Sequence, residues 1–414
     1  MSETPANIGP HQWLNDAKSQ AVMNALGEGK ARYVGGCVRN AILNEPVNDI
    51  DIATVHVPEK VIELLEAVGI KAVPTGIEHG TITAVVDGKP FEITTLRKDV
   101  DTDGRHAEVA FSADWEGDAA RRDFTMNAIY VDASGVIFDP VGGYADAKAA
   151  RVRFIGDAAT RIAEDYLRIL RYFRIDAWYG RGEMDQDALK ACAAGKDGLK
   201  QLSAERVQKE LLKLIAADDP LPAIRAMAAA GILVEVLPEA SEFERLSRLA
   251  EIESTQLFVS DAVRRLGALL PSDEAVITSL ADRLKLSNED RARLIRMHTD
   301  QTKIISYLSV REVRKALYWM GPDLFKDRVL LGWAVDPKLN NGVQWRTLLA
   351  MADSWTKPDF PLTGHQVKAA NVPAGPEVGR VMAEVEEWWV ESDFIDDELS
   401  IIERLKAVVQ ATVY

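Results

Sequence analysis

The chain has 414 residues, 47% hydrophobic and 27% charged, so it can bury a large core and is neither disordered nor fibrous. Its formal net charge of −15 argues, on average, against a nucleic-acid partner. Because the chain has only two cysteines, it cannot be a disulfide scaffold. Since no apolar run approaches the roughly 20 residues of a membrane span, we expect a soluble, cytoplasmic protein.

The first 155 residues predict a mixed α/β region of short strands. Turn signals at Asp87-Gly88 and at 132–135 separate runs of β-branched and aromatic residues, as in β-hairpins. Pro58 and Gly69 bound one amphipathic helix, predicted over 59–67. The predicted strands are 32–34, 49–53, 81–86, 91–95, 127–131, 136–138 and 152–155.

Beyond residue 156 the strand signals end and helical periodicity dominates. The fold class predicted is therefore α+β, a mixed-sheet head followed by an all-helical remainder. Charge is uneven there: residues 281–346 carry 13 Lys and Arg against 8 Asp and Glu, and residues 347–414 carry 5 against 12. A basic stretch before an acidic tail remains compatible with RNA binding. The clearest predicted helices are 160–178, 204–217, 222–230, 289–298 and 310–320.

Three carboxylates in the head predict a metal site. Asp49 and Asp51 alternate with isoleucines, so on a strand both carboxylates share one face. Glu92 stands in an apolar strand. Acids converging from neighbouring strands suit Mg²⁺, which prefers oxygen ligands and keeps positions open for phosphates. Alone, an Asp-x-Asp pattern is also a common surface feature.

Upstream of these acids, a strand ends in Gly35-Gly36 and leads into a helix that carries Arg39. Two glycines let backbone N–H groups approach a phosphate, the helix N-terminus favours an anion, and Arg39 adds a cation. The segment is not a P-loop. Its combination with Asp-x-Asp ten residues on is more specific than either feature alone.

Later segments match motifs of one known family in order. Residues 121–128 read RRDFTMNA and residues 162–168 read IAEDYLR, and helical segments at 203–213 and 364–380 follow. With GGCVRN and DID, they resemble the signature of nucleotidyltransferases related to polymerase β. The branch they resemble is that of bacterial-type (class II) tRNA nucleotidyltransferases, the CCA-adding enzymes. The resemblance is strong over 30–215 and thinner beyond.

This resemblance implies an Mg²⁺-dependent enzyme that adds C, C and A to the 3′ end of tRNA from CTP and ATP and releases pyrophosphate. It implies contact with the tRNA acceptor arm and leaves the oligomeric state open. It also implies four regions: a catalytic head over 1–155, a helical neck over 156–218, a tRNA-binding helical body over 219–345 and a helical tail over 346–414.

For the site, the resemblance implies that Asp49 and Asp51 bind metal and that, with Glu92, they form the catalytic set. The remaining residues are implied in nucleotide binding: Gly35, Gly36, Arg39, Arg122, Asp123, Asn127, Glu164, Asp165, Arg168, Arg171 and Arg174.

The resemblance implies that residues 162–168 select the nucleotide, and two of them, Asp165 and Arg168, can account physically for base choice. Cytosine and adenine both present an amino donor beside a ring-nitrogen acceptor, which a carboxylate and a guanidinium match. Uracil and guanine present the reverse and leave unsatisfied groups, at about 1–3 kcal/mol each. Three residues apart in a helix, Asp165 and Arg168 share a face. Glu164 holds Arg168, as the resemblance implies. A solvated ion pair is the ordinary alternative at this spacing.

One position departs from the family pattern: residue 40 is Asn where Asp is usual. Asn is nearly isosteric and can still hydrogen-bond, so we expect activity to survive. The polar segment 97–115 resembles the family's loop linked to adding A. Three alternatives stay open: an enzyme that adds only A, a bacterial poly(A) polymerase, and a non-catalytic RNA-binding protein on this fold.

Overall fold

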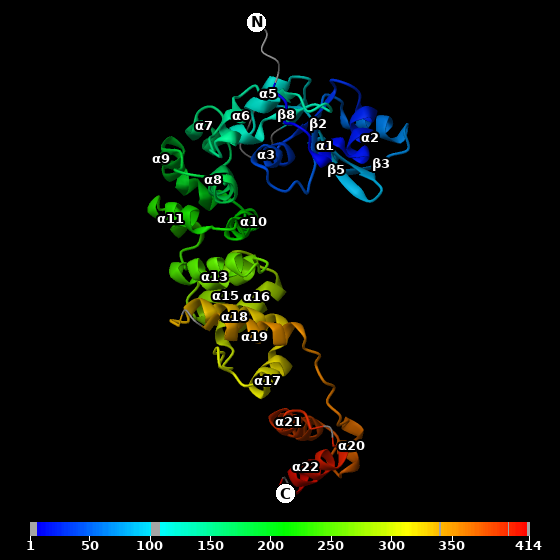
Figure 1. Cartoon of the computed structure of the whole chain (residues 1–414), viewed down its shortest axis with the longest axis vertical. Helices are drawn as coiled ribbons and strands as arrows, with labels where there is room; N and C mark the ends of the chain where they lie inside the picture. Colours follow the sequence, from blue (N-terminus) through cyan, green and yellow to red (C-terminus); the bar gives the residue numbers. More distant parts are fainter. Residues whose placement is uncertain (1–5, 101–107, 339–340, 396, 412–414) are drawn as a thin grey trace. The chain divides into compact units, whose positions relative to one another are not determined.

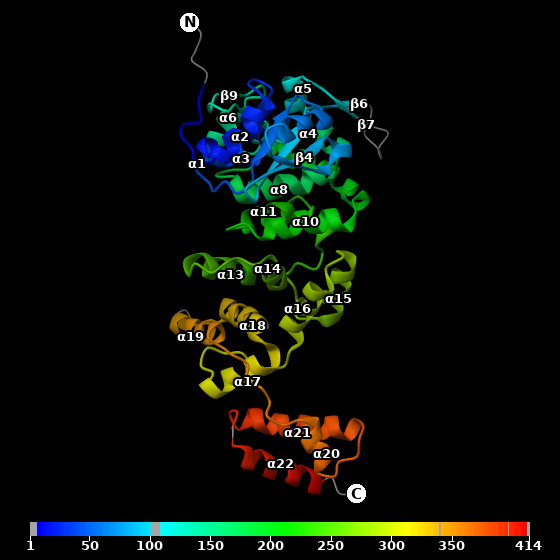
Figure 2. The ribbon, with the colours of Figure 1, turned by 90° about the vertical axis from the view of Figure 1, so that its right-hand side faces the viewer.

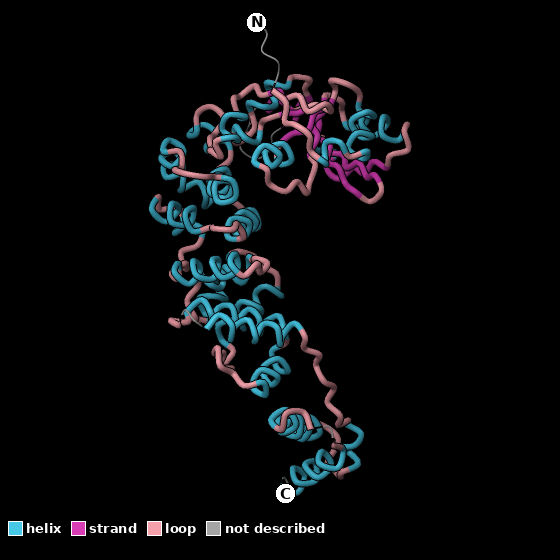
Figure 3. The backbone as a smooth tube through the Cα atoms, in the orientation of Figure 1, coloured by secondary structure: helices cyan, strands magenta, loops and turns pink. Residues whose placement is uncertain are grey.

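The computed structural model describes residues 6–100, 108–338, 341–395 and 397–411. Its contacts divide the chain into two compact units, Met1–Pro238 and Glu239–Tyr414. All strands of the described chain lie in the first unit, and the second is built from helices alone (Figure 3). The predicted α+β class is confirmed, whereas the division into four regions stays a prediction.

A seven-stranded mixed sheet organises the first unit, in the order β3-β4-β5-β2-β1-β8-β9. β2 and β5 run parallel, and every other neighbouring pair is antiparallel. A separate two-stranded ribbon, β6-β7, flanks the segment 101–107, which lies outside the described residues. The strands are β1 (Ala31–Val34), β2 (Asp51–Thr54), β3 (Lys71–Gly76), β4 (Thr81–Val86), β5 (Lys89–Thr95), β6 (Arg97–Val100), β7 (Glu108–Phe111), β8 (Tyr130–Val131) and β9 (Ile137–Phe138).

Three predicted strands need correction. The second begins at Asp51, so Asp49 lies in the preceding loop and does not share its pleat. Residues 125–127 form a 3-10 turn, because Asn127 and Ala128 bond back to Phe124 and Thr125, and only 130–131 are strand. Residues 152–155 contribute one isolated bridge, between Phe124 and Phe154.

Helices of the first unit follow from local signals. Pro58 opens α4 (Pro58–Glu66) and Val61 and Leu65 bury one face of it, close to the predicted bounds. In Figures 1 and 2, α8, α10 and α11 lie next to one another. The other helices are α1 (Gln12–Asn15), α2 (Ala17–Leu26), α3 (Gly36–Leu43), α5 (Trp115–Ala120), α6 (Gly143–Lys148), α7 (Ala158–Glu164), α8 (Leu167–Tyr179), α9 (Gln186–Gly195), α10 (Ala204–Ile215), α11 (Leu221–Ala229) and α12 (Leu233–Val236).

The helix predicted over 160–178 is two helices, α7 and α8. Asp165 is extended (φ −155°, ψ 106°), and its side chain accepts the backbone N–H of Leu167, the first residue of α8. A short acidic side chain bonded to nearby backbone competes with the helix and marks its end. Asp165 therefore does not share a helical face with Arg168, contrary to the spacing argument.

The second unit consists of helices around apolar contacts that include those of α21 and α22 with Tyr318 of α17. None of the helices described for this chain is both long and apolar enough to span a membrane. The helices are α13 (Phe243–Thr255), α14 (Ala262–Leu269), α15 (Glu274–Arg283), α16 (Asn288–Thr299), α17 (Val310–Met320), α18 (Pro322–Val335), α19 (Gly342–Asp353), α20 (Gly364–Ala369), α21 (Pro376–Glu391) and α22 (Glu398–Ala411).

Most cations of the basic stretch 281–346 already have acidic partners inside this unit. Arg293 donates to Asp261 and Asp327, and Arg314 donates to Asp393 of the acidic tail. Ion pairs of this kind cancel much of the positive field that the sequence count suggests.

Candidate active site

Two of the three predicted carboxylates meet on adjacent parallel strands. Asp51 opens β2 and stands opposite Glu92 of β5 in the ladder. Asp51 is half-buried, whereas Glu92 and Asp49 are exposed. Within the described part of the chain, none of these three carboxylates accepts a hydrogen bond or forms an ion pair. Negative charge is therefore concentrated at this edge of the sheet without a direct ion pair to any described residue.

Electrostatics at this edge oppose ionisation of Asp51. Burial and the charge of Glu92 raise the pKa of Asp51 to about 6; Asp49 adds to this, while Arg122 and Arg39 act in the opposite direction. A carboxylate in such surroundings is stabilised in its charged form by an added cation.

Beside the acids, the Gly35-Gly36 turn begins α3. Gly35 has φ +75°, which favours glycine, and a Cβ there would stand 3.5 Å from Oδ2 of Asp51. The missing side chain thus keeps open the space in front of that carboxylate. Gly36, the first residue of α3, lines the same cavity as Asp51, and the first N–H groups of a helix have no partner within that helix.

Arg39 is fixed on several sides. Its guanidinium donates to Oδ1 of Asn127 (2.7 Å) and to Oδ1 of Asn40 (2.8 and 3.2 Å), and it stacks 3.7 Å from the ring centre of Tyr179. The amide of Asn40 also donates to the carbonyl of Pro46 (2.7 Å). Asn40 therefore connects Arg39 to the loop that leads to Asp49, and a carboxylate could not make that donation.

Arg122 is held by a buried acid that the sequence did not single out. Asp118 accepts hydrogen bonds from Arg122, from Arg121 and from the hydroxyl of Tyr130. Burial would raise the pKa of Asp118, but the two arginines and the tyrosine hold that pKa below its ordinary value. Arg121 also donates to the carbonyl of Arg97, in keeping with a structural role.

Asp123 links the head to α8. Its carboxylate accepts from the amide of Asn127 (3.2 Å), from the backbone of Phe124 (2.8 Å) and from Arg171 (2.8 Å). Burial would raise the pKa of Asp123, yet the charge of Arg171 and these hydrogen bonds hold it below its ordinary value. Predicted nucleotide-binding residues of two separate motifs are thus joined by one ion pair.

The predicted base-selecting pair is not paired with itself. Arg168 donates to Glu164, to the carbonyl of Arg161 (2.8 Å) and to that of Arg121 (3.3 Å). Asp165 instead accepts from Arg206 of α10 (2.7 Å). Glu164 does hold Arg168, as the family resemblance implies.

Arg174 is not a surface residue. Its side chain is 17% exposed and donates to Glu210 (2.5 Å), whose own side chain is 7% exposed. Arg171 approaches the same carboxylate at 4.0 Å. Glu210 thus anchors both arginines from α10.

Three cavities connect these groups through shared lining residues. A cavity of about 270 Å³ contains Asp51, Glu92 and Arg122. A second, of about 220 Å³, is lined by the predicted triphosphate-binding residues together with Asp51 and Arg122. A third, of about 420 Å³, shares Arg122 with both and contains the selecting residues; its lining comprises Arg97, Arg121, Arg122, Asp123, Asp165, Leu167, Arg168, Arg171 and Arg206.

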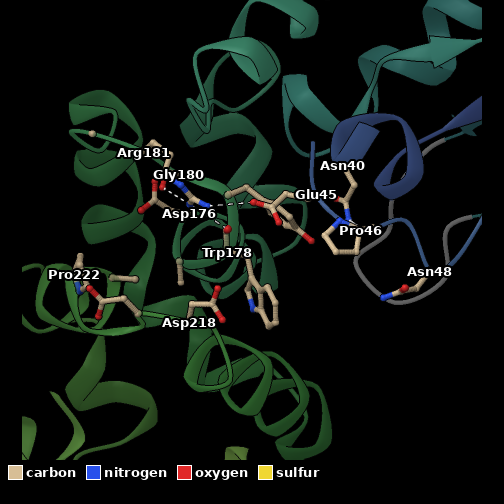
Figure 4. A pocket seen from close by; sticks show the side chains of 15 residues that line it. Asn40, Glu45, Pro46, Asn48, Asp176, Trp178, Gly180, Arg181, Asp218 and Pro222 are labelled. Atoms are coloured by element: carbon tan, nitrogen blue, oxygen red, sulfur yellow. Dashed lines mark hydrogen bonds and ion pairs between the residues drawn. The ribbon is translucent and has the colours of Figure 1, made fainter. Parts of the chain in front are cut away.

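A fourth and larger cavity, of about 520 Å³, lies between the loop after α3 and the end of α8 (Figure 4). Figure 4 shows Glu45 directed at Arg181, with which it forms an ion pair of 3.5 Å. Asp176 also lines it, and its carboxylate accepts no hydrogen bond in the described structure. Burial raises the pKa of Asp176 to about 6, and Arg181 lowers it in part.

The acidic edge fits a hard divalent cation. Its carboxylates form no hydrogen bond or direct ion pair with the residues that the structure describes, and Gly35 leaves space beside Asp51. Over the described residues, no group of three or more His, Cys, Asp and Glu forms a ready-made ligand cage. Two carboxylates with open positions beside them suit an ion that completes its shell with water and phosphate oxygens.

Sequence reasoning missed several residues that shape these cavities: Arg97, Asp118, Tyr179, Arg206 and Glu210. Arg206 and Glu210 fall in the matched segment 203–213, which was a usable signal. Asp118 lies in an ordinary helical pattern, and nothing in its neighbours distinguishes it.

Comparison with known proteins places the chain in a family. The model described as "Poly A polymerase head domain" matches residues 31–153, and "Probable RNA and SrmB- binding site of polymerase A" matches residues 183–244. The mitochondrial CCA tRNA nucleotidyltransferase 1 of Mus musculus is 32% identical over 401 residues, covering 94% of this chain and 89% of the relative. The CCA-adding enzyme of Geobacillus thermodenitrificans is 37% identical over 223 residues, covering 53% and 54%.

Solved structures agree. The Bacillus stearothermophilus CCA-adding enzyme in complex with CTP matches with a TM-score of 0.77 and 26% identity, over 94% of this chain and 97% of that one. The Thermotoga maritima CCA-adding enzyme complexed with tRNA shares the fold, with a TM-score of 0.62 and 20% identity, over 95% and 94%. Nucleotidyltransferases of this kind generally use divalent metals. The chain belongs to the family of CCA tRNA nucleotidyltransferases, of the bacterial (class II) type.

Proposed function

We propose that this enzyme adds C, C and then A to the 3′ end of tRNA, using CTP and ATP and releasing pyrophosphate. The observation that carries the proposal is the sharing of Arg122 and Asp51 between cavities. The acidic edge, the Gly35-Gly36 turn and the selecting arginines line adjoining cavities. A nucleotide bound there reaches the acids with its phosphates and the arginines with its base.

We propose Mg²⁺ as the ion, held by Asp49 and Asp51. When bound, it supplies charge that activates the attacking oxygen and stabilises the leaving pyrophosphate. Glu92, across the ladder from Asp51, orients the terminal 3′-hydroxyl of the tRNA and accepts its proton. The N–H groups at the start of α3 and the side chain of Arg39 bind the triphosphate.

Base choice rests on Asp165 and Arg168, presented by the break between two helices and not by one helical face. Asp165 accepts the amino group shared by cytosine and adenine, and Arg168 donates to the neighbouring ring nitrogen. Uracil and guanine instead place a carbonyl acceptor against the carboxylate and an N–H donor against the guanidinium. These desolvated groups then have no hydrogen-bond partner. The ion pairs of Arg171 with Asp123 and of Arg174 with Glu210 keep the remaining lining rigid.

The alternatives differ in what they extend. A poly(A) polymerase shares the head, and the head model carries that name. The relatives that match well beyond the head are CCA enzymes, which favours the complete CCA activity. An enzyme that adds only A, and a non-catalytic RNA binder, are the remaining outcomes of the test.

The decisive test is primer extension with Mg²⁺ on three tRNA transcripts, ending at the discriminator base, at C and at CC. We expect all three to grow to one defined CCA end when CTP and ATP are present. Extension of the CC transcript alone identifies an A-adding enzyme, and long A tails identify a poly(A) polymerase. Binding of tRNA without any incorporation overturns the enzymatic proposal.

We further propose the head, neck, body and tail division given above, with tRNA backbone bound by the body. Most arginines over 281–346 are ion-paired. The candidates for phosphate contacts are therefore Lys285, Arg296, Lys303 and Lys338, which form no direct ion pair among the described residues. A cytoplasmic location is proposed from the two buried free thiols, Cys37 and Cys192.

A further inference from the structure

Arg206 reaches the selecting cavity from outside the predicted set. It lies in the first turn of α10, and Ser203 caps that helix by accepting the backbone N–H of Arg206. Its guanidinium donates to Oδ2 of Asp165 at 2.7 Å, and its side chain lines the same cavity as Arg168 and Arg171.

The carboxylate of Asp165 is therefore fixed at both oxygens. Oδ1 accepts the backbone N–H of Leu167 at 3.1 Å, and Oδ2 accepts from Arg206. A carboxylate has about four lone-pair positions, so two remain to accept from a ligand. Without Arg206, one oxygen has no partner, and the carboxylate can rotate about its last bond.

The same helix supports the opposite end of the selecting residues. Glu210, one turn after Arg206, pairs with Arg174 and lies 4.0 Å from Arg171. Arg168, by contrast, has its charged partner nearby in the sequence, at Glu164. The charged partner that orients the side chain of Asp165 is instead 41 positions away.

We propose that Arg206 is a specificity-determining positioning residue, which aims the carboxylate of Asp165 at the amino group of cytosine or adenine. This inference rests on the proposed function. Arg206 acts through Asp165 and needs no contact with the nucleotide. Its loss weakens the preference for C and A over U and G more than it slows transfer of a correct nucleotide.

The test compares Arg206→Ala and Arg206→Lys with the wild type in single-turnover extension of a CC-ended tRNA, with ATP, CTP, UTP and GTP supplied separately. Lys209→Ala is the matched control, because Lys209 is an exposed cation on α10 with no ion pair or hydrogen bond in the described structure. We expect the ATP-to-GTP preference of Arg206→Ala to fall about fivefold, the effect of a half-exposed charged contact. Arg206→Lys should restore part of it, and Lys209→Ala should match the wild type.

A double-mutant cycle separates positioning from a general structural effect. If Arg206 acts through Asp165, Arg206→Ala should change nothing further in an Asp165→Ala background. Equal losses in both backgrounds, or an unchanged preference in folded Arg206→Ala, would overturn the inference while leaving CCA addition intact. A wild-type enzyme that incorporates neither C nor A defeats the proposed function itself.

Discussion

The acidic edge and the selecting cavity treat charge in opposite ways. At the edge, Asp51 and Glu92 face each other across a ladder and form no direct ion pair with any described residue. In the cavity, Asp123 pairs with Arg171, and Asp165 pairs with Arg206. Both regions adjoin Arg122, so the contrast arises within one site.

This difference shows which region has its charged side chains paired once the chain has folded. Paired charges hold one another in place before any ligand arrives, which is what discrimination between similar bases requires. Like charges without a direct ion pair store an unfavourable interaction, which Arg122 and Arg39 reduce in part and an added cation relieves further. The edge therefore needs a bound cation to complete it, whereas the cavity is already ordered and can discriminate between bases.

The largest effect is expected for Asp51→Asn, which removes a negative charge from the acidic edge and leaves the selecting cavity unchanged. We expect nucleotidyl transfer to fall more than about a thousandfold, because a metal-held charge supplies several kcal/mol and each 1.36 kcal/mol is tenfold. Single-turnover extension measures the loss. Asp87→Asn, the same change in an exposed turn, should keep full activity; substantial activity in folded Asp51→Asn would refute the metal role.

The reciprocal test removes a partner from the cavity side. Glu210→Ala leaves Arg174 and Arg171 without their shared carboxylate and should destabilise the fold by about 3 kcal/mol, the lower end for a broken buried pair. Chemical denaturation measures this, and the KM values for CTP and ATP should rise together. Glu205→Ala, on the exposed face of α10, is the control, and an equal effect there would deny Glu210 its anchoring role.

A third test asks whether another half-buried carboxylate without an ion pair among the described residues, Asp176, also has a raised pKa. Asp176 has a folded pKa of about 6 against an ordinary 3.8, so the folded protein binds this proton more tightly than the unfolded chain. As the pH rises from about 4 to about 7, Asp176 should therefore lower the free energy of unfolding of the wild type by up to about 3 kcal/mol. Asp176→Asn should remove the part of this pH dependence that Asp176 contributes and leave the part that comes from Asp51. Equal stability of variant and wild type at pH 7.5 would contradict it.

The smallest effect concerns Asn40, which connects Arg39 to the loop that leads to Asp49. Asn40→Ala removes the contacts to Arg39 and Pro46 and should raise the KM for nucleotides about five- to tenfold, on the order of one net hydrogen bond. Asn40→Asp keeps the contact to Arg39 and should stay within about threefold of the wild type. If both variants behave alike, the bond to Pro46 is the one that matters.

Short-range signals predicted the parts of the molecule that depend on them. The Asp87-Gly88 turn joins β4 and β5 as expected, with both residues at positive φ, because few residues other than Gly, Asn and Asp accept that geometry. The Gly35-Gly36 turn and the meeting of Asp51 with Glu92 also followed from local pattern and from strand adjacency.

Long-range contacts account for what the sequence concealed. The helix predicted over 160–178 breaks at Asp165-Tyr166, where a Cβ on Gly198 would lie 2.1 Å from the ring of Tyr166. That packing partner is 32 residues away, so periodicity within the segment could not reveal it. Likewise, the contact of Arg206 with Asp165 depends on how α10 packs against α8.

The internal pairing of the cavity also bears on ionic strength. A neutral base that binds to Asp165 and Arg168 leaves their ion pairs with Arg206 and Glu164 in place and releases few bound ions. Preference among bases should therefore change little between low and high salt, whereas binding of the tRNA backbone weakens steeply. In concentrated salt, the affinity of the enzyme for tRNA should therefore fall while its preference for C and A over U and G stays the same.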